Sequence, residues 1–464
     1  MNIQFDSKNL LADMVGKEHG VTRSEIERSE SKALKALRTL RRQSEAGLYG
    51  FPHLPFQDTA IRAVTRYAGE VNGTYDTVCV VGIGGSALGV WALDCGIRGP
   101  HPVQGAHTPQ HPRLVILDNV DPSFTAQALD SMDPRKTLVV VIAKSGGTAE
   151  TVSTFLIVRE WMERALGRRK AAARITAVTT EGKGDLFELA RAERYRTFGI
   201  PENVGGRFSV LTPVGLVPAA LAGIDIRKLA RGAARMTHFC WQPDLEENIA
   251  LRAALYHWLI WTRKHKSIQV ALPYSNHLWG TAFWFRQLWA ESLGKAHNLK
   301  GEVVHAGQTP VAALGATDQH SQVQLYLEGP NDKVFTFWAV KKFASAGKIP
   351  SRKFGLPAFD ALAGQSLARL IDAERRATAA AMVEAERPNC TVTLDRVDEE
   401  HLGAFFQMME FQTAFVGGML GIDAFDQPGV ELGKKFTYGL MGREGYEQYR
   451  RQFQTYERKR ARAK

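Results

Sequence analysis

A strand, a glycine-rich turn and a helix follow one another over residues 137–158, TLVVVIAKSGGTAETVSTFLIV, and this unit constrains the fold more than any other stretch. Residues 138–142 form an apolar, largely β-branched run with no polar residues between them. Such a run predicts a strand that is covered on both faces, which is typical of a parallel sheet flanked by helices. We therefore expect an α/β fold.

The turn between that strand and the helix has the composition of a phosphate-binding loop. It contains Lys144, Ser145, Gly146, Gly147 and Thr148. The glycines let backbone N–H groups converge, the side chains add two hydroxyls and an ammonium, and the helix N-terminus adds its positive dipole end. The spacing fits neither a Walker loop nor a GxGxxG turn, so it favours a small phosphorylated metabolite over a nucleotide. The alternative is an ordinary glycine-rich turn capped by Ser or Thr.

Strands and helices alternate from Thr77 onward, and a second glycine turn, GIGGS at 82–86, follows the first of these strands. In a doubly wound parallel sheet, ligands bind beyond the carboxyl ends of strands. Both glycine turns fall there, so they can share one pocket. A second α/β pattern, with a helix at 249–263 and strands at 267–274 and 334–340, predicts a second domain of the same kind.

Local signals suggest the domain boundaries. Thr22 and Glu25 form a capping-box pattern at the start of a helix with one apolar stripe, and the Gly- and Pro-rich residues 47–56 end it. We divide the chain into an N-terminal helical arm (1–48), a first domain with the phosphate loops (49–230), a second domain (231–400), and C-terminal helices that pack back and end in a basic tail (401–464).

The composition argues against several classes of protein. The chain of 464 residues has no apolar run near the roughly 18 residues of a membrane span and no signal-peptide pattern, so we expect a cytoplasmic protein without membrane contact. Five of the last seven residues are basic and account for much of the net charge of +11. No nucleic-acid-binding motif interleaves aromatic residues with the basic ones, so nucleic acid is not a predicted partner. Four scattered cysteines predict neither disulfides nor a metal site.

One helix pairs two candidate polar side chains. Gln287 and Glu291 are one turn apart within residues 276–295, where Asn276 is expected to cap the helix and Gly294 to end it. In the last turn, the helix dipole and aromatic neighbours would both raise the proton affinity of Glu291, as a general base requires. A solvated glutamate at a helix end is the commoner alternative.

Three other segments place candidate side chains beside turns. Two glycines precede Arg207, which could bind an anion, although a surface arginine after a turn is the simpler interpretation. His320 lies among polar residues, and a lone histidine is more often structural than catalytic. Gln427 is expected to cap a helix that starts with proline, so Lys434 would lie near the second turn of that helix. The alternative is that Lys434 belongs to an ordinary charged helix face.

Six motifs occur together in the order GIGGSALG, AKSGGTAET, VGGRFS, QLWAESLGK, GATDQHSQ and FDQPGVELGK. Over about residues 77–440 they resemble the glucose-6-phosphate isomerase (phosphoglucose isomerase) family. The resemblance implies two sugar-isomerase (SIS) domains, each a three-layer αβα sandwich, flanked by helices from both termini. It also implies reversible isomerisation of glucose 6-phosphate to fructose 6-phosphate through ring opening and a cis-enediol, in glycolysis and gluconeogenesis.

The resemblance implies a role for each matching residue. It places phosphate contacts at Ser145, Thr148 and the backbone around Lys144, the sugar pocket at Gly85 and Ser86, sugar contacts at Gln287 and Gln427, the base at Glu291, the cation that stabilises the enediolate at Arg207, and the groups that open the ring at His320 and Lys434. The family often has Ser before the loop lysine, where this chain has Ala143. One phosphate hydroxyl contact is therefore absent or supplied by another group.

This chemistry needs no metal, nucleotide or other cofactor, because an acid/base pair, a carboxylate and a cation suffice to open the ring and move one proton. The resemblance further implies a homodimer with shared active sites, because the matching histidine reaches into the neighbouring subunit. Two alternatives remain open. One is a non-catalytic SIS module that senses a sugar phosphate, which would not need Glu291, His320 and Lys434. The other is an isomerase that also accepts mannose 6-phosphate.

Overall fold

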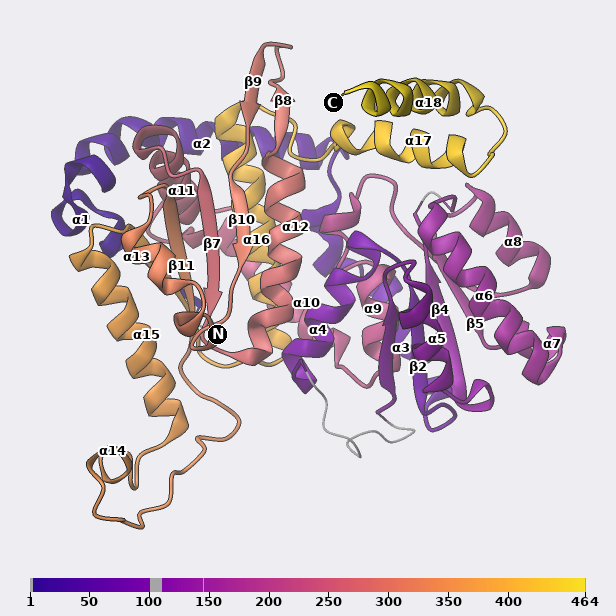
Figure 1. Cartoon of the computed structure of the whole chain (residues 1–464), viewed down its shortest axis with the longest axis horizontal. Helices are drawn as coiled ribbons and strands as arrows, with labels where there is room; N and C mark the ends of the chain where they lie inside the picture. Colours follow the sequence, from indigo (N-terminus) through magenta and orange to yellow (C-terminus); the bar gives the residue numbers. More distant parts are fainter. Residues whose placement is uncertain (1–2, 101–110, 145, 464) are drawn as a thin grey trace.

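The computed structural model describes residues 3–100, 111–144 and 146–463. Two five-stranded sheets stand side by side, and helices pack around both (Figure 1). This arrangement confirms the predicted α/β architecture of two doubly wound, mainly parallel sheets with flanking helices.

The first sheet is entirely parallel and has the strand order β3 (Arg113–Leu117), β2 (Thr77–Val81), β4 (Thr137–Ile142), β5 (Ile175–Thr179) and β6 (Arg196–Gly199). Strands β2, β4 and β5 are buried at every position, which is the reason that their sequences do not alternate. The chain runs from β2 to β3 on one side and then crosses to β4 on the other. The turns after β2 and β4 therefore lie at the switch point of the sheet, where ligands bind in this type of fold.

The second sheet has the order β1 (Ile3–Asp6), β12 (Asn389–Leu394), β11 (Lys333–Val340), β7 (Ile268–Pro273) and β10 (Thr309–Ala312). Strands β7 and β11 confirm the two strands predicted in this region. Strand β1 pairs antiparallel with β12, so residues from the start of the chain complete a sheet built mostly from residues 268–394. The short β1 was not predicted.

Helix α16 (Glu399–Leu420) runs through the centre of the molecule and is buried along almost its entire length (Figure 1). It crosses α10 (Ile226–Cys240) at very short range. A Cβ at Gly403 would lie 1.9 Å from the carbonyl oxygen of Leu229, and a Cβ at Gly232 would lie 1.8 Å from that of Glu400. The two helices can approach this closely only because both positions are glycine.

Replacing Gly403 with Ala is expected to destabilise the protein by about 2 kcal/mol or more, because the added methyl overlaps a backbone atom that cannot move aside easily. The matched control is Gly69→Ala in α3 (Asp58–Val71), where an added Cβ meets nothing within 4 Å. That change removes a flexible residue from a helix and is expected to stabilise by about 0.5–1 kcal/mol. Thermal melting and denaturant unfolding measure the stability of both variants. Equal stability of the two variants would show that the α10–α16 crossing tolerates a larger separation.

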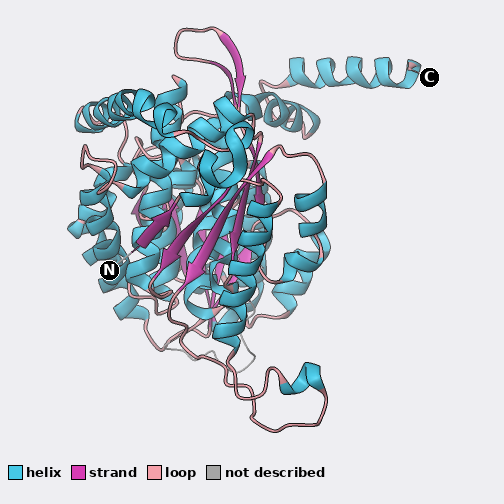
Figure 2. Cartoon of the chain, turned by 90° about the vertical axis from the view of Figure 1, so that its left-hand side faces the viewer, coloured by secondary structure: helices cyan, strands magenta, loops and turns pink. Residues whose placement is uncertain are grey.

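The remaining elements enclose this core. Thr22 and Glu25 do form the predicted capping box, at the start of α2. Three segments project from the body: the hairpin of β8 (Lys295–His297) and β9 (Val303–Ala306), the loop that contains α14 (Pro357–Asp360), and α18 (Glu447–Arg462) (Figure 2). The other helices and strands are α1 (Ala12–His19), α2 (Arg23–Glu45), α4 (Leu88–Arg98), α5 (Pro122–Asp130), α6 (Ala149–Leu166), α7 (Arg168–Ala172), α8 (Asp185–Glu193), α9 (Pro213–Leu221), α11 (Ile249–Lys264), α12 (Trp279–Leu293), α13 (Val323–Glu328), α14 (Pro357–Asp360), α15 (Leu367–Glu384), α17 (Glu431–Leu440), α18 (Glu447–Arg462), β8 (Lys295–His297) and β9 (Val303–Ala306).

Candidate active site

The glycine turn after β2 packs directly on the turn that carries Arg207. Both are short 3-10 helices, Gly84–Ser86 and Gly206–Phe208. A Cβ at Gly85 would lie 2.3 Å from the carbonyl carbon and oxygen of Gly206. Gly84 has a φ of +58°, and an added Cβ there would lie 3.1 Å from Nε2 of Gln287. The glycines of GIGGS thus bring the first sheet into contact with both the arginine turn and α12.

Arg207 is buried and all three of its guanidinium nitrogens are used. Nε donates to Oγ of Ser292 at 2.7 Å, Nη1 to Oε1 of Gln427 at 2.9 Å, and Nη2 to the carbonyl oxygens of Ala424 at 2.6 Å and Asp426 at 3.0 Å. Burial lowers the pKa of the guanidinium, and nearby carboxylates oppose this shift, Glu291 before Asp426. The side chain remains a fixed cation, since arginine does not lose its proton in proteins.

Glu291 lies between the guanidinium and an amide. Its Oε2 is 3.4 Å from Nη1 of Arg207, and its Oε1 accepts a hydrogen bond from Nε2 of Gln287 at 3.1 Å. Gln287 and Glu291 lie on one face of α12, as their i, i+4 spacing predicted. The Glu291 side chain is 34% exposed, so a substrate can reach its carboxylate.

Two details around Glu291 differ from the prediction. Helix α12 begins at Trp279, after the 3-10 turn Asn276–Leu278, so Asn276 is not its N-cap, although Gly294 does follow its last residue. The aromatic residues of α12 also do not enclose the Glu291 side chain as the prediction assumed, because that side chain is one-third exposed. A cation that the sequence analysis missed stands close by. Nζ of Lys295 donates to the carbonyl oxygens of Glu291 at 2.5 Å and Ser292 at 3.1 Å, which balances the negative end of the helix.

Gln427 precedes a proline-led 3-10 turn, Pro428–Val430, that leads into α17, as predicted. It makes no capping bond there, because its amide oxygen accepts from Arg207 instead. Residues 424–427 are therefore tied to the arginine through two carbonyl groups and one side chain. This brings three distant parts of the sequence together around one guanidinium.

The phosphate loop after β4 is described at every position except Ser145, which lies outside the described residues. Thr148 takes the N-cap position of α6, but its side chain makes no capping hydrogen bond. Nζ of Lys144 donates to the carbonyl oxygens of Glu202 and Val204, each at 2.8 Å. Burial lowers the pKa of this ammonium, and Glu202 opposes that shift. Two of the three N–H donors of Lys144 therefore bind residues 202–204 and hold the loop against them.

Two of the predicted catalytic residues have no hydrogen bond or ion pair to the Arg207–Glu291 group among the described residues. His320 is exposed and ends a 3-10 turn, Thr317–His320, after β10. Lys434 is in the first turn of α17, and its ammonium is 2.9 Å from Oε1 of Glu431. Of the predicted site residues, the structure therefore joins Arg207, Gln287, Glu291 and Gln427 by side-chain contacts, with Gly85 packed against them.

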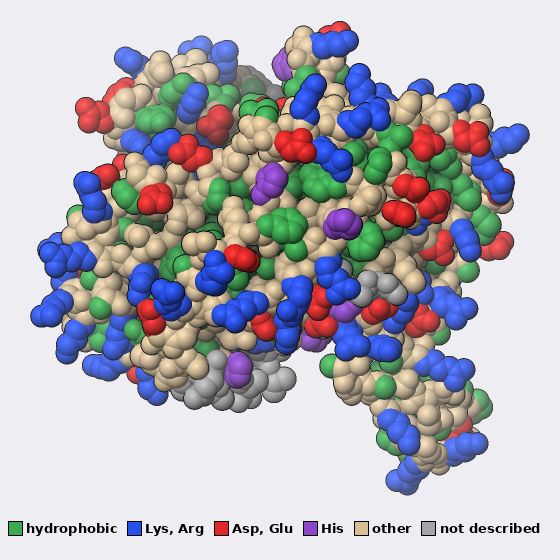
Figure 3. Space-filling view, turned by 180° about the vertical axis from the view of Figure 1, so that it is seen from behind, with side chains coloured by type: hydrophobic (Ala, Val, Ile, Leu, Met, Phe, Trp, Pro, Cys, Tyr) green, Lys and Arg blue, Asp and Glu red, His purple; other side chains and the backbone are tan. Residues whose placement is uncertain are grey.

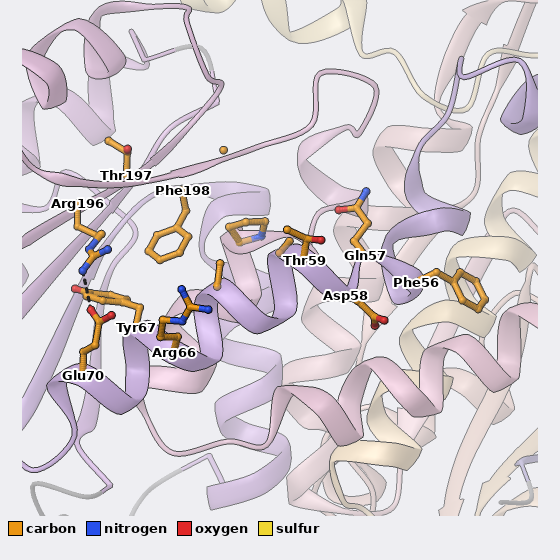
Figure 4. Close-up of a pocket in the computed structure, with 14 residues that line it drawn as sticks. Phe56, Gln57, Asp58, Thr59, Arg66, Tyr67, Glu70, Arg196, Thr197 and Phe198 are labelled. Carbon is orange, nitrogen blue, oxygen red and sulfur yellow. Dashed lines mark hydrogen bonds and ion pairs between the residues drawn. The ribbon is translucent and has the colours of Figure 1, made fainter.

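A large pocket of about 740 Å³ lies elsewhere, between α3 and the edge strand β6 (Figure 4). Tyr67 and Phe198 line it, and Arg196 there pairs with Glu70. It contains none of the predicted site residues. Among the residues that the structure describes, no group of three His, Cys, Asp or Glu side chains could hold a metal ion, and no helix is long and apolar enough to cross a membrane.

The fold and the site define an α/β protein with a cluster of polar side chains near the ends of parallel strands, which is where proteins of this fold bind small metabolites. A sequence model of one family, phosphoglucose isomerase, matches residues 58–452. The chain belongs to the phosphoglucose isomerase family, as the six motifs predicted.

Relatives of known sequence and structure agree with this assignment. A glucose-6-phosphate isomerase from Carboxydothermus hydrogenoformans is 42% identical, with 97% of each chain covered, and one from Rubrobacter xylanophilus is 39% identical, with 96% of this chain and 99% of the relative covered. A crystal structure described as a hypothetical protein from Thermus thermophilus superposes with a TM-score of 0.84 at 34% identity, covering 95% of this chain and all of the other.

Proposed function

We propose that the protein interconverts glucose 6-phosphate and fructose 6-phosphate. The observation that carries the proposal is the accessible carboxylate of Glu291, held between the amide of Gln287 and the buried cation of Arg207. The naming of the full-length relatives as glucose-6-phosphate isomerases supports the same activity.

The proposed reaction moves one proton between two carbons of the open-chain sugar. The Glu291 carboxylate removes the proton from C2, the C–H electrons form a C1=C2 double bond, and the C1 carbonyl oxygen becomes negative. The Arg207 guanidinium stabilises that oxygen, because it is fixed in place by its other hydrogen bonds before the charge develops. Once a proton has moved from the C2 hydroxyl to the C1 oxygen, Glu291 returns its proton to C1 and the C2 carbonyl forms.

The other predicted residues bind and open the substrate in this scheme. We assign phosphate binding to Ser145, Thr148 and the loop backbone, and the absence of a capping bond leaves the Thr148 hydroxyl available for it. Gly85 and Ser86 line the sugar site, and His320 and Lys434 open the ring. No residue in the scheme needs a metal or an organic cofactor.

We also propose that the working unit is a homodimer in which His320 serves the site of the partner subunit. His320 is exposed and has no hydrogen bond to the Arg207–Glu291 group among the described residues. Segments that project from the body (Figure 2) carry exposed large apolar side chains, with Leu299 exposed at 69%, Val303 at 65% and Phe359 at 63%. A second copy of the chain would cover such surfaces. Seen from behind, the molecule also shows apolar side chains between its charged groups (Figure 3).

Mixing two inactive variants tests shared sites. His320→Ala and Glu291→Gln homodimers are each expected to be nearly inactive. After subunit exchange, half of the sites in a mixed dimer should recover both groups, so an equal mixture should regain about a quarter of the wild-type rate if subunits reassort at random. Exchange is verified independently with differently tagged subunits. Proven mixed dimers without activity would contradict the shared site.

A coupled assay with glucose 6-phosphate tests the proposed function itself. Turnover is expected with the wild-type protein, and its absence would favour a non-catalytic sensor of sugar phosphates. Mannose 6-phosphate in the same assay shows whether the site also accepts the C2 epimer. We place the protein in the cytoplasm, where a reducing environment suits its four buried free cysteines.

A further inference from the structure

The C-terminal hairpin formed by α17 and α18 lies above α6 and α8, at the end of the first sheet where the phosphate loop is found (Figure 1). The Tyr438 hydroxyl on α17 donates a hydrogen bond to the carbonyl oxygen of Gly147 at 3.1 Å. Residues nearly 300 positions apart are thereby fixed against one another. The hairpin is thus part of the surroundings of the phosphate loop.

Arg443 lies in the turn between α17 and α18 and faces the same loop. A methyl group at Gly147 would lie 3.8 Å from both Nη1 and Nη2 of Arg443. The guanidinium is 4.7 Å from the ring centre of Tyr438 and 5.5 Å from that of Tyr446, so the two rings hold it beside the loop. It makes no hydrogen bond or ion pair with any described residue. Its five donors are therefore available to a ligand.

A cation from outside its own sequence would strengthen the binding of a phosphate at this loop. Its own cation, Lys144, is directed to the carbonyl oxygens of Glu202 and Val204. Ala143, which directly follows β4, contributes only a buried methyl group. Arg443 is the guanidinium placed against Gly147, and a guanidinium can bind two oxygens of one phosphate at once.

We propose that Arg443 binds the phosphate group of the substrate beside Gly147 and Thr148, at the start of α6. The inference rests on the proposed function, because it assumes that a sugar phosphate occupies this site. One competing role exists within the protein. Oδ2 of Asp185, on α8, would lie 3.9 Å from the same methyl position at Gly147, so Arg443 could instead serve to hold this carboxylate.

Four variants separate these roles. Arg443→Ala removes the cation, Arg443→Lys keeps the charge without the fork of donors, and Asp185→Asn removes the competing carboxylate. Arg458→Ala, on the exposed surface of α18, is the matched control for losing one positive charge from the hairpin. Each is assayed with glucose 6-phosphate, and each is titrated calorimetrically with inorganic phosphate. Thermal melting checks that the hairpin remains folded.

Arg443→Ala is expected to raise KM for glucose 6-phosphate, and the dissociation constant for inorganic phosphate, about tenfold, which is the usual effect of losing one charge-assisted hydrogen bond. Arg443→Lys should show a smaller rise, and Asp185→Asn and Arg458→Ala should stay within about twofold of wild type. Unchanged KM and phosphate binding in Arg443→Ala would overturn the inference. An equal rise in Asp185→Asn would overturn it as well and reassign Arg443 to that carboxylate. The phosphate titration does not depend on turnover, so it separates the two proposals. If the wild-type protein had no activity but Arg443→Ala still bound inorganic phosphate more weakly than wild type, only the proposed function would be contradicted.

Discussion

Glu291→Gln is expected to lower kcat by about 10²- to 10⁴-fold, the range for losing a well-placed general base. The glutamine keeps the size of the side chain and can still accept a hydrogen bond from Gln287 through its amide oxygen. It cannot take a proton from C2. Because binding contacts are retained, KM for glucose 6-phosphate should change much less than kcat.

Glu160→Gln is the control for this change, since Glu160 is an exposed residue of α6 that pairs with Arg164. It should leave kcat unchanged. Steady-state rates of the two variants, together with calorimetric binding of glucose 6-phosphate, provide the comparison. If Glu291→Gln kept a kcat within tenfold of wild type, the carboxylate would not be the base.

Arg207→Ala is expected to lower kcat by about 10²-fold or more with a smaller change in KM, as for other groups that stabilise charge in the transition state. The reason is the position of the guanidinium, 3.4 Å from the proposed base and locked by four further hydrogen bonds. Removing it should also destabilise residues 424–427, because the carbonyl oxygens of Ala424 and Asp426 would lose a buried partner.

Arg207→Lys separates the catalytic and structural parts of that effect. It keeps a positive charge but cannot make all the same hydrogen bonds, so kcat should fall less than in Arg207→Ala while the melting temperature also decreases. A variant that melts like wild type and changes only KM would assign Arg207 to ground-state binding.

Much of the fold could be predicted because its strands have a strong local pattern. The unbroken run at 138–142 has that pattern because β4 is covered on both faces. Strand β1 could not be predicted in the same way. It has four residues, and it is a strand only because β12, almost 400 residues later, offers an edge for pairing. Asn276 similarly has the right chemistry for a cap, but a 3-10 turn occupies that position.

The predicted arrangement of side chains agrees best with the structure where spacing alone determines geometry. Gln287 and Glu291 had to share a face of one helix, and they do. The partners of Arg207 had no such signal, because Ser292 and the carbonyl groups of residues 424 and 426 reach it only through the tertiary fold. Lys144 shows the same limit. Its place in a glycine-rich loop predicts a ligand contact at that loop, but nothing in the local sequence indicates that its ammonium binds two carbonyl groups of its own chain.

Exchange of the C2 hydrogen tests the central claim, that Glu291 carries the proton between C2 and C1. Glucose 6-phosphate deuterated at C2 is incubated in light water with wild type and with Glu291→Gln, and the label is followed by NMR in both sugars. Wild type is expected to move part of the deuterium to C1 of fructose 6-phosphate and lose the rest to solvent from the enediol. Glu291→Gln should do neither at a measurable rate while still binding the substrate. Loss or transfer of the label by Glu291→Gln at close to the wild-type rate would show that another group is the base.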